Sequence, residues 1–163
     1  MLRTDIHIRI ANIEDAPAIS RVIIRALRET NARDYTPLII ERIAASFSPH
    51  HVAHAVAERQ VLVATPANSA SADGLSSGTI IGTVSFERGA LRSFFVDPAY
   101  HGEGIGSALL EEIEGLAAAK GFFSLSVAAS ITAESFYLHR GYTTLRPVQQ
   151  GNVHVFLMRK ELD

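Results

Sequence analysis

Apolar residues recur along this chain at two different spacings, and each spacing predicts one kind of secondary structure. Between residues 6 and 10, isoleucines alternate with polar residues, which is typical of a half-buried strand. After Asn12 the apolar residues recur every three or four positions, which predicts a helix that begins at Asn12 with Asp15 as the capping partner. Pro37 and Pro49 each follow a threonine or a serine, so each marks the start of a further helical segment.

The middle of the chain is predicted to form a meander of three strands. The apolar stretches that indicate these strands cover residues 61–65, 79–86 and 91–96. Residues 66–78 are rich in alanine, serine, asparagine and glycine, and strand patterns resume directly after them. We therefore expect a loop there rather than a linker between domains. Residues 87–90 are predicted to form the turn between the last two strands.

The last sixty residues continue the alternation of helices and strands. The pattern predicts a helix over 104–120, a strand over 122–127, a short helix over 132–140, and strands over 142–146 and 153–159 joined by a linker over 147–152. The resulting order, β-α-α-β-β-β-α-β-α-β-β, predicts an α/β (α+β) fold with one mixed sheet and helices on its faces. We expect residues 1–163 to form a single domain.

Composition excludes several classes of protein. The formal net charge is −2, so the chain has no basic footprint for nucleic acid. There is no cysteine, which rules out disulfides, thiolate zinc sites and a cysteine nucleophile. No apolar run approaches the length of a membrane span, and the first residues do not resemble a signal peptide. We therefore expect a cytoplasmic protein without membrane partners.

The most informative segment joins the third meander strand to the long helix, and it carries glycine at 102, 104 and 106. Each glycine in or beside a helix costs roughly 0.5–1 kcal/mol relative to alanine. A helix N-terminus offers unpaired N–H groups and about half a positive charge, so glycines there let a phosphate approach the backbone. The segment is therefore predicted to bind a phosphate group.

Two common phosphate-binding motifs do not match this segment. A dinucleotide fingerprint has the spacing G-x-G-x-x-G directly after a strand, whereas here the spacing is G-x-G-x-G and residues 97–101 intervene. A P-loop requires lysine followed by serine or threonine, and the segment contains no lysine. A Rossmann-type nucleotide binder is therefore disfavoured.

Two segments together resemble a known family. Val96-Asp97-Pro98, followed by Tyr-His-Gly-Glu-Gly-Ile-Gly over 100–106, is similar to the acetyl-CoA motif of the GNAT superfamily of N-acetyltransferases. Residues 133–142, Ala-Glu-Ser-Phe-Tyr-Leu-His-Arg-Gly-Tyr, resemble the second conserved segment of that family. The resemblance implies the GNAT fold, with a central, mostly antiparallel sheet of about seven strands. It also implies transfer of an acetyl group from acetyl-CoA to a primary amine, in a ternary complex.

The resemblance also implies roles for particular residues. Backbone groups of Phe94, Phe95 and Val96 would bind the pantetheine arm as an added strand does. The pyrophosphate would be held by His101, Gly102, Glu103, Gly104, Ile105, Gly106 and Ser107. Tyr137 would donate a proton to the departing CoA, and Ser130 would contact the cofactor. Tyr35 would lie at the acceptor site, and Glu87 is one carboxylate that a chain of waters could reach.

Three positions depart from the family pattern. His101 replaces an arginine or glutamine, Glu103 places a negative charge beside the phosphate site, and Leu125 stands where some relatives carry a basic glutamate. The general base is therefore not identified, and a catalytically silent CoA-binding sensor or scaffold remains the alternative. The acceptor, a small-molecule amine or a peptide N-terminus, also stays open, as does a homodimer.

A metal site is a further alternative, because His50 and His54 share one face of the third predicted helix. A zinc-protease motif requires a glutamate directly after the first histidine, and that position is His51. No third ligand is evident in the sequence. We therefore interpret these histidines as a polar helix face and predict no metal.

Overall fold

The computed structural model describes residues 5–67, 79–151 and 153–163, so most of the predicted loop at 66–78 lies outside the described residues. The helices are α1 (Ala16–Glu29), α2 (Pro37–Ala45), α3 (Pro49–Glu58), α4 (Ile105–Ala119) and α5 (Glu134–Leu138). The strands are β1 (Ile6–Ile10), β2 (Gln60–Pro66), β3 (Gly82–Glu87), β4 (Ala90–Val96), β5 (Ser124–Ala129), β6 (Thr143–Gln150) and β7 (Val153–Glu161). Both proline-led helices are present, and the third helical segment is a full helix.

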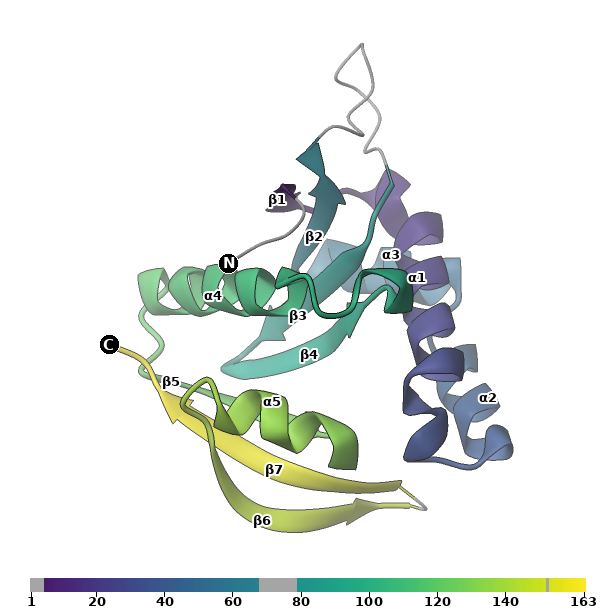
Figure 1. The fold of residues 1–163 in the computed structure, drawn as a ribbon. Coiled ribbons are helices and arrows are strands. Elements are labelled where there is room, and N and C mark those ends of the chain that lie inside the picture. Colours follow the sequence, from purple (N-terminus) through teal and green to yellow (C-terminus); the bar gives the residue numbers. More distant parts are fainter. Residues whose placement is uncertain (1–4, 68–78, 152) are drawn as a thin grey trace.

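The strands form one seven-stranded sheet in the order β1-β2-β3-β4-β5-β7-β6 (Figure 1). Every neighbouring pair is antiparallel except β4 and β5, which are parallel. β4 and β5 meet at a single residue pair, Ala90 with Ser126, whereas β5 and β7 pair over six residues. The sheet is therefore divided into two parts that are joined near the start of β4.

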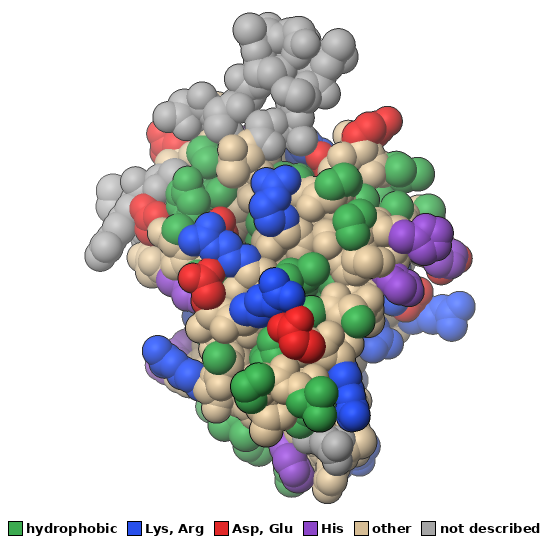
Figure 2. All heavy atoms as spheres, turned by 90° about the vertical axis from the view of Figure 1, so that its right-hand side faces the viewer, with side chains coloured by type: hydrophobic (Ala, Val, Ile, Leu, Met, Phe, Trp, Pro, Cys, Tyr) green, Lys and Arg blue, Asp and Glu red, His purple; other side chains and the backbone are tan. Residues whose placement is uncertain are grey.

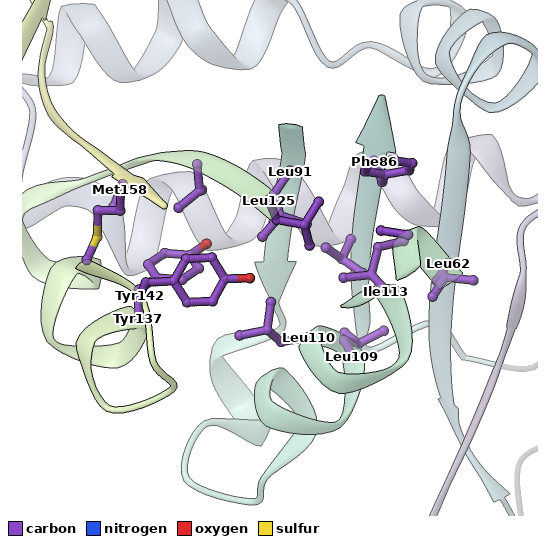
Figure 3. Packing of buried hydrophobic residues seen from close by; sticks show 14 of the residues in the cluster. Leu62, Phe86, Leu91, Leu109, Leu110, Ile113, Leu125, Tyr137, Tyr142 and Met158 are labelled. Carbon is purple, nitrogen blue, oxygen red and sulfur yellow. The ribbon is translucent and has the colours of Figure 1, made fainter. Parts of the chain in front are cut away.

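Two hydrophobic clusters cover the two faces of the sheet, and the alternation of side chains along β2 feeds both. Leu62 and Ala64 belong to the cluster under α4, whereas Val61 and Val63 belong to the cluster under α1, α2 and α3. Figure 3 shows the first cluster, which runs from Leu62 across α4 to the tyrosines beside α5. The expected mixed sheet with helices on both faces is confirmed.

Several predicted boundaries differ from the structure. The strand predicted over 79–86 covers Gly82–Glu87, and the helix predicted from Asn12 begins as a 3-10 turn over Ile13–Asp15 before α1. The strand predicted to begin at Phe122 begins at Ser124, and the side chain of Phe123 is 84% exposed. Residues 147–152 were expected to be a linker, but β6 continues through Pro147 to Gln150. β6 lies at the edge of the sheet, where a missing N–H donor is tolerated.

The first strand and the first helix are joined by a buried ion pair. Asp15 is 1% exposed, and its two carboxylate oxygens accept hydrogen bonds from the guanidinium of Arg9 at 2.8 and 2.9 Å. The backbone N–H of Asn12 also donates to this carboxylate at 2.8 Å, as the predicted capping arrangement requires. The carboxylate thus holds β1 against the N-terminus of α1.

Replacing this carboxylate with an amide tests its contribution. We expect Asp15→Asn to lower the free energy of unfolding by about 2–3 kcal/mol, because it leaves the guanidinium of Arg9 without its carboxylate partner. The partial exposure of Arg9 to solvent limits this cost. Urea denaturation measures the change. Glu41→Gln, which removes an exposed ion pair with Arg28, is the control and should leave the midpoint nearly unchanged. Equal effects of the two substitutions would contradict the structural role of Asp15.

Candidate functional site

Within the described residues, the edge of β4 that faces away from β3 has no partner strand beyond Ala90, where it meets β5. Asp97 N–H donates to Ile81 O at 2.8 Å, and antiparallel pairing alternates, so the backbone groups of Phe94 and Val96 point away from β3. The ring nitrogen Nε2 of His101 lies 3.3 Å from the carbonyl oxygen of Val96, at the far end of this edge. An extended ligand could therefore add to β4 as a strand does.

Phe95 faces differently from its two neighbours. It pairs with Thr83 of β3, and its ring packs edge-on against Phe47 at 5.7 Å, on the face covered by α1. Its backbone groups are therefore directed at β3 rather than at the open edge. Of the three strand residues implied by the family resemblance, Phe94 and Val96 have the appropriate orientation.

The glycine loop adopts a backbone that non-glycine residues disfavour. Gly102 and Gly104 have φ angles of +80° and +85°, in the left-handed region. Gly104 is also the N-cap of α4. A Cβ atom added at Gly106 would meet the ring of Phe136 at 3.4 Å, so the first turn of α4 packs closely against α5. The left-handed backbone thus explains glycine at 102 and 104, whereas the contact at Gly106 is at an ordinary van der Waals distance.

The first amides of α4 are available to a ligand. The first helical hydrogen bond runs from Ala108 N–H to Gly104 O at 3.1 Å. Among the residues that the structure describes, the N–H groups of Ile105, Gly106 and Ser107 have no backbone acceptor. These amides and the positive end of the helix dipole form an anion-binding arrangement.

Sequence reasoning did not identify Arg140, which lies beside this helix N-terminus. Its guanidinium donates two hydrogen bonds to Ser107 Oγ, one of them from Nε at 2.9 Å, and a third from Nη1 to Phe136 O at 3.1 Å. The Cζ atom lies 4.0 Å from the centroid of the Phe136 ring. Two of the five N–H donors of the guanidinium remain unused by these contacts.

The position of Arg140 is electrostatically unfavourable without an anion. A cation at the positive end of a helix dipole is repelled by it, and the structure shows no ion pair to Arg140 within the described ranges. A phosphate placed between the helix amides and the guanidinium would relieve this repulsion.

Tyr137 of α5 lies among aromatic rings beside β4. Its side chain is 5% exposed, with ring centroids 5.3 Å from Phe136, 5.4 Å from Tyr142 and 6.2 Å from Phe94. Burial raises the pKa of the Tyr137 hydroxyl above its usual range, and burial is the only cause. The group therefore retains its proton at neutral pH and can act only as a donor.

Tyr142 lies beside Tyr137 in the same cluster (Figure 3). Its hydroxyl donates to Glu114 Oε2 at 2.8 Å, and Glu114 also accepts from Lys160 Nζ at 3.0 Å. Burial, together with this hydrogen bond, raises the pKa of Tyr142. Tyr142 is thus fixed by a charged partner on α4, whereas Tyr137 is not.

The remaining predicted residues lie in three places. Tyr35, in the loop before α2, is half-buried against the cluster under α1, and burial raises its pKa. Ser130 follows β5 and occupies the N-cap position of the short turn that leads to α5, without a capping hydrogen bond from its side chain. Glu87 lies at the β3–β4 turn, where its carboxylate is 3.6 Å from Arg59 Nε. Glu87 is therefore at the opposite end of β4 from the glycine loop.

A contact across the sheet brings Tyr35 and Ser130 into the same region. Asp34 accepts hydrogen bonds from the hydroxyl and the backbone N–H of Thr132, at 2.8 and 3.2 Å. The loop before α2 is thereby linked to the segment that follows Ser130. The structure thus groups Tyr35 and Ser130 on one side of the open edge.

The described residues contain no group of three histidine, cysteine or carboxylate side chains that could hold a metal ion. His51 Nδ1 is 2.7 Å from Ser48 Oγ, and His54 Nδ1 is 3.6 Å from Glu58 Oε1.

No helix within the described residues is both long and apolar enough to cross a bilayer. On the side shown in Figure 2, basic and acidic side chains are interspersed rather than gathered by sign.

Comparison with known proteins defines the class. A family model described as an acetyltransferase (GNAT) domain matches residues 31–162, and the chain belongs to this family. None of the curated proteins matches the chain.

Solved structures share the fold over nearly the whole chain. A GCN5-related N-acetyltransferase from Rhodopseudomonas palustris has 25% identity and a TM-score of 0.86, covering 99% of this chain and 98% of its own. The PaiA N-acetyltransferase from Thermoplasma acidophilum, solved in complex with coenzyme A, has 23% identity and a TM-score of 0.77, with coverages of 96% and 99%. YncA from Salmonella typhimurium, solved with acetyl-CoA, has 24% identity and a TM-score of 0.64, with coverages of 98% and 95%.

Substitution of Gly104 tests the anion-binding arrangement. We expect Gly104→Val to weaken CoA binding about 100-fold, equivalent to two charge-assisted hydrogen bonds of about 1.5 kcal/mol each. Titration calorimetry with CoA measures the loss. Backbone strain at the positive φ angle costs about 1–3 kcal/mol, which a domain of ordinary stability tolerates.

Gly121→Val is the matched control, since Gly121 has a φ of +91° at the opposite end of α4. It should lose similar stability and retain its affinity for CoA. Normal CoA affinity in Gly104→Val would contradict the arrangement.

Proposed function

We propose that this chain transfers an acetyl group from acetyl-CoA to a primary amine by direct attack in a ternary complex. The observation that carries this proposal is the divergence of β4 from β5. The open edge of β4 leads at one end to the unpaired amides of α4, and Tyr137 lies beside it. An extended molecule with a phosphate group at one end fits these features.

The chain offers suitable partners for the pantetheine arm and for the diphosphate of CoA. Backbone groups of Phe94 and Val96 would bind the amides of the pantetheine arm. Amides of Ile105, Gly106 and Ser107, with the guanidinium of Arg140, would bind the diphosphate. The ligands in the structures of the Thermoplasma and Salmonella proteins support the same assignment.

Bound acetyl-CoA supplies a thioester whose acetyl carbon an amine can attack. Tyr137, which keeps its proton at neutral pH, would give that proton to the departing thiolate, and the proton that the attacking nitrogen loses would return to the Tyr137 oxygen through solvent. The backbone N–H of Val96, on the open edge, would stabilise the negative charge that develops on the carbonyl oxygen.

The amine must be neutral when it attacks. A lysine-like amine, with a pKa of about 10.4, requires about 4 kcal/mol to lose its proton near pH 7.5. An α-amino group, with a pKa of about 8, requires less than about 1 kcal/mol. Because Glu87 is paired with Arg59 at the far turn, an acceptor with a low pKa suits this site best.

Removal of the Tyr137 hydroxyl tests the proton donor. We expect Tyr137→Phe to lower kcat about 10- to 1,000-fold, in the range of general-acid effects. Release of free thiol from acetyl-CoA, with a panel of amines, measures the rate. The aromatic packing is retained, so the melting temperature and the affinity for CoA should change little.

The same assay separates the two candidate functions. Turnover by the unaltered protein excludes the silent CoA-binding module, whereas CoA binding without turnover on any amine favours that alternative. Unchanged turnover in Tyr137→Phe would remove Tyr137 from the chemistry.

Arg140 is expected to contribute to binding rather than to chemistry. We predict that Arg140→Gln raises the Kd for CoA about tenfold, the value of one charge-assisted hydrogen bond, with little effect on kcat. Calorimetry and steady-state kinetics measure the two quantities separately. Arg140→Lys keeps the charge and should lose less affinity. A fall in kcat with unchanged CoA affinity would contradict this role.

A further inference from the structure

A cavity lies on the face of the sheet opposite α4 and α5. Its volume is about 470 Å³, in the range of small-molecule sites. It is bounded by side chains of α1 and α3 and by the polar residues of β3 and β4. Its lining residues on β4, Arg92 and Ser93, precede the open edge, so this cavity is distinct from the proposed donor site.

An irregularity in β4 directs side chains into this cavity. The pairing of β3 with β4 shifts register between Thr83 and Ser85, and Ser93 has a φ of +49°. Arg92 and Ser93 both line the cavity, whereas Leu91 and Phe94 pack in the core on the opposite face. Bulges of this kind redirect side chains and are frequent beside active sites.

The irregularity also links the cavity to the donor site. Phe94, at the start of the open edge, directly follows Ser93 along β4. A molecule in the cavity therefore reaches β4 at the level where the open edge begins. This suits an acceptor that approaches from one face while the donor occupies the other.

The hydroxyl groups in the cavity are arranged as acceptors. Thr83 and Ser85 are 1% and 2% exposed, and both lie on the cavity face of β3. The Thr83 hydroxyl donates to Leu62 O at 2.9 Å, and the Ser85 hydroxyl donates to Arg92 O at 2.8 Å. Because both protons are engaged, the hydroxyl oxygens can only accept, and an amine supplies the matching N–H donors.

Two arginines line the cavity, and they differ in their partners. Arg59 lies 3.6 Å from the carboxylate of Glu87. No ion pair reaches the guanidinium of Arg92, an exposed residue, anywhere in the described part of the chain. A ligand carboxylate could pair with Arg92, since arginine binds carboxylates with two parallel hydrogen bonds.

We infer that this cavity binds the acceptor, and that the acceptor is an apolar amino acid or a molecule like it. Arg92 binds the carboxylate, the oxygens of Thr83 and Ser85 accept hydrogen bonds from the amine, and the apolar body packs against the remainder of the lining. The apolar part of the lining includes Ile19, Ile23, Phe47, Val52, Val56 and Val61. This inference rests on the acetyltransferase function proposed above, and it names the substrate class.

The test compares apolar amino acids with the corresponding amino acid amides, which lack the carboxylate charge. Alanine, valine, leucine, isoleucine, methionine and phenylalanine, with their amides, are supplied to the protein and acetyl-CoA, and thiol release is measured. Because an amino acid amide has a less basic amine than the free amino acid, kcat/KM is expressed per concentration of neutral amine. On this basis we expect at least one amino acid to exceed its amide by about tenfold or more. In Arg92→Gln this ratio should fall toward one.

Two further measurements separate the possible failures. CoA affinity by calorimetry should be the same in Arg92→Gln and in the unaltered protein. Arg42→Gln, an exposed arginine of α2 outside the cavity lining, should preserve the ratio. An amide preferred over its acid, a ratio unaffected by Arg92→Gln, or acetylation confined to other amines would each overturn the inference and leave the proposed function intact. Failure to bind CoA, or to acetylate any amine, would instead remove the proposed function and the inference with it.

Discussion

The proposed donor site depends on two strands at the centre of the sheet that pair over only one residue pair. β4 and β5 are neighbours in the order of strands, yet they are bridged only at Ala90 and Ser126. Beyond that bridge the polar backbone of β4 has no partner strand, and unpaired edges are normally covered or blunted. An extended ligand that hydrogen-bonds with Phe94 and Val96 would satisfy this edge. The proposed donor site is therefore a place where the sheet is incomplete.

At the end of this edge, several electropositive groups lie together and, within the described residues, also lack a partner of opposite charge. The amides at the start of α4 and the guanidinium of Arg140 are all electropositive, and Ser107 and Phe136 hold them close together. Such an arrangement is unfavourable until an anion neutralises it. Stability and binding are thus opposed here, as is common in functional sites. Structural stability is supplied elsewhere, by the two clusters and by the ion pair of Asp15.

Local patterns in the sequence predicted much of this structure. The strand-to-helix loop with glycine at 104 and 106, and the aromatic pair at 136 and 137, are contiguous segments, so the family resemblance could be recognised from them. Arg140 was missed because its contact with Ser107 spans 33 positions and appears only when α5 packs on α4. The divergence of β4 and β5 likewise depends on non-local pairing.

Other features were hidden for related reasons. The strand pattern over 91–96 gives no sign that the register shifts at Ser93, because a bulge shows only in how two strands pair. Pro147 suggested the end of a strand, whereas the edge position of β6 allows it. The sequence suggested Glu87 as a carboxylate that a chain of waters could reach, but the structure places it at the β3–β4 turn, beside Arg59.

The most direct test of the account is an NMR titration of the ¹⁵N-labelled protein with CoA. The titration tests whether CoA binds along the open edge of β4 with its diphosphate at the amides of α4. We expect the largest changes in amide chemical shift at Phe94, Val96, Gly104, Gly106 and Ser107. Saturable changes confined to other parts of the sheet, or no change at millimolar CoA, would contradict this expectation.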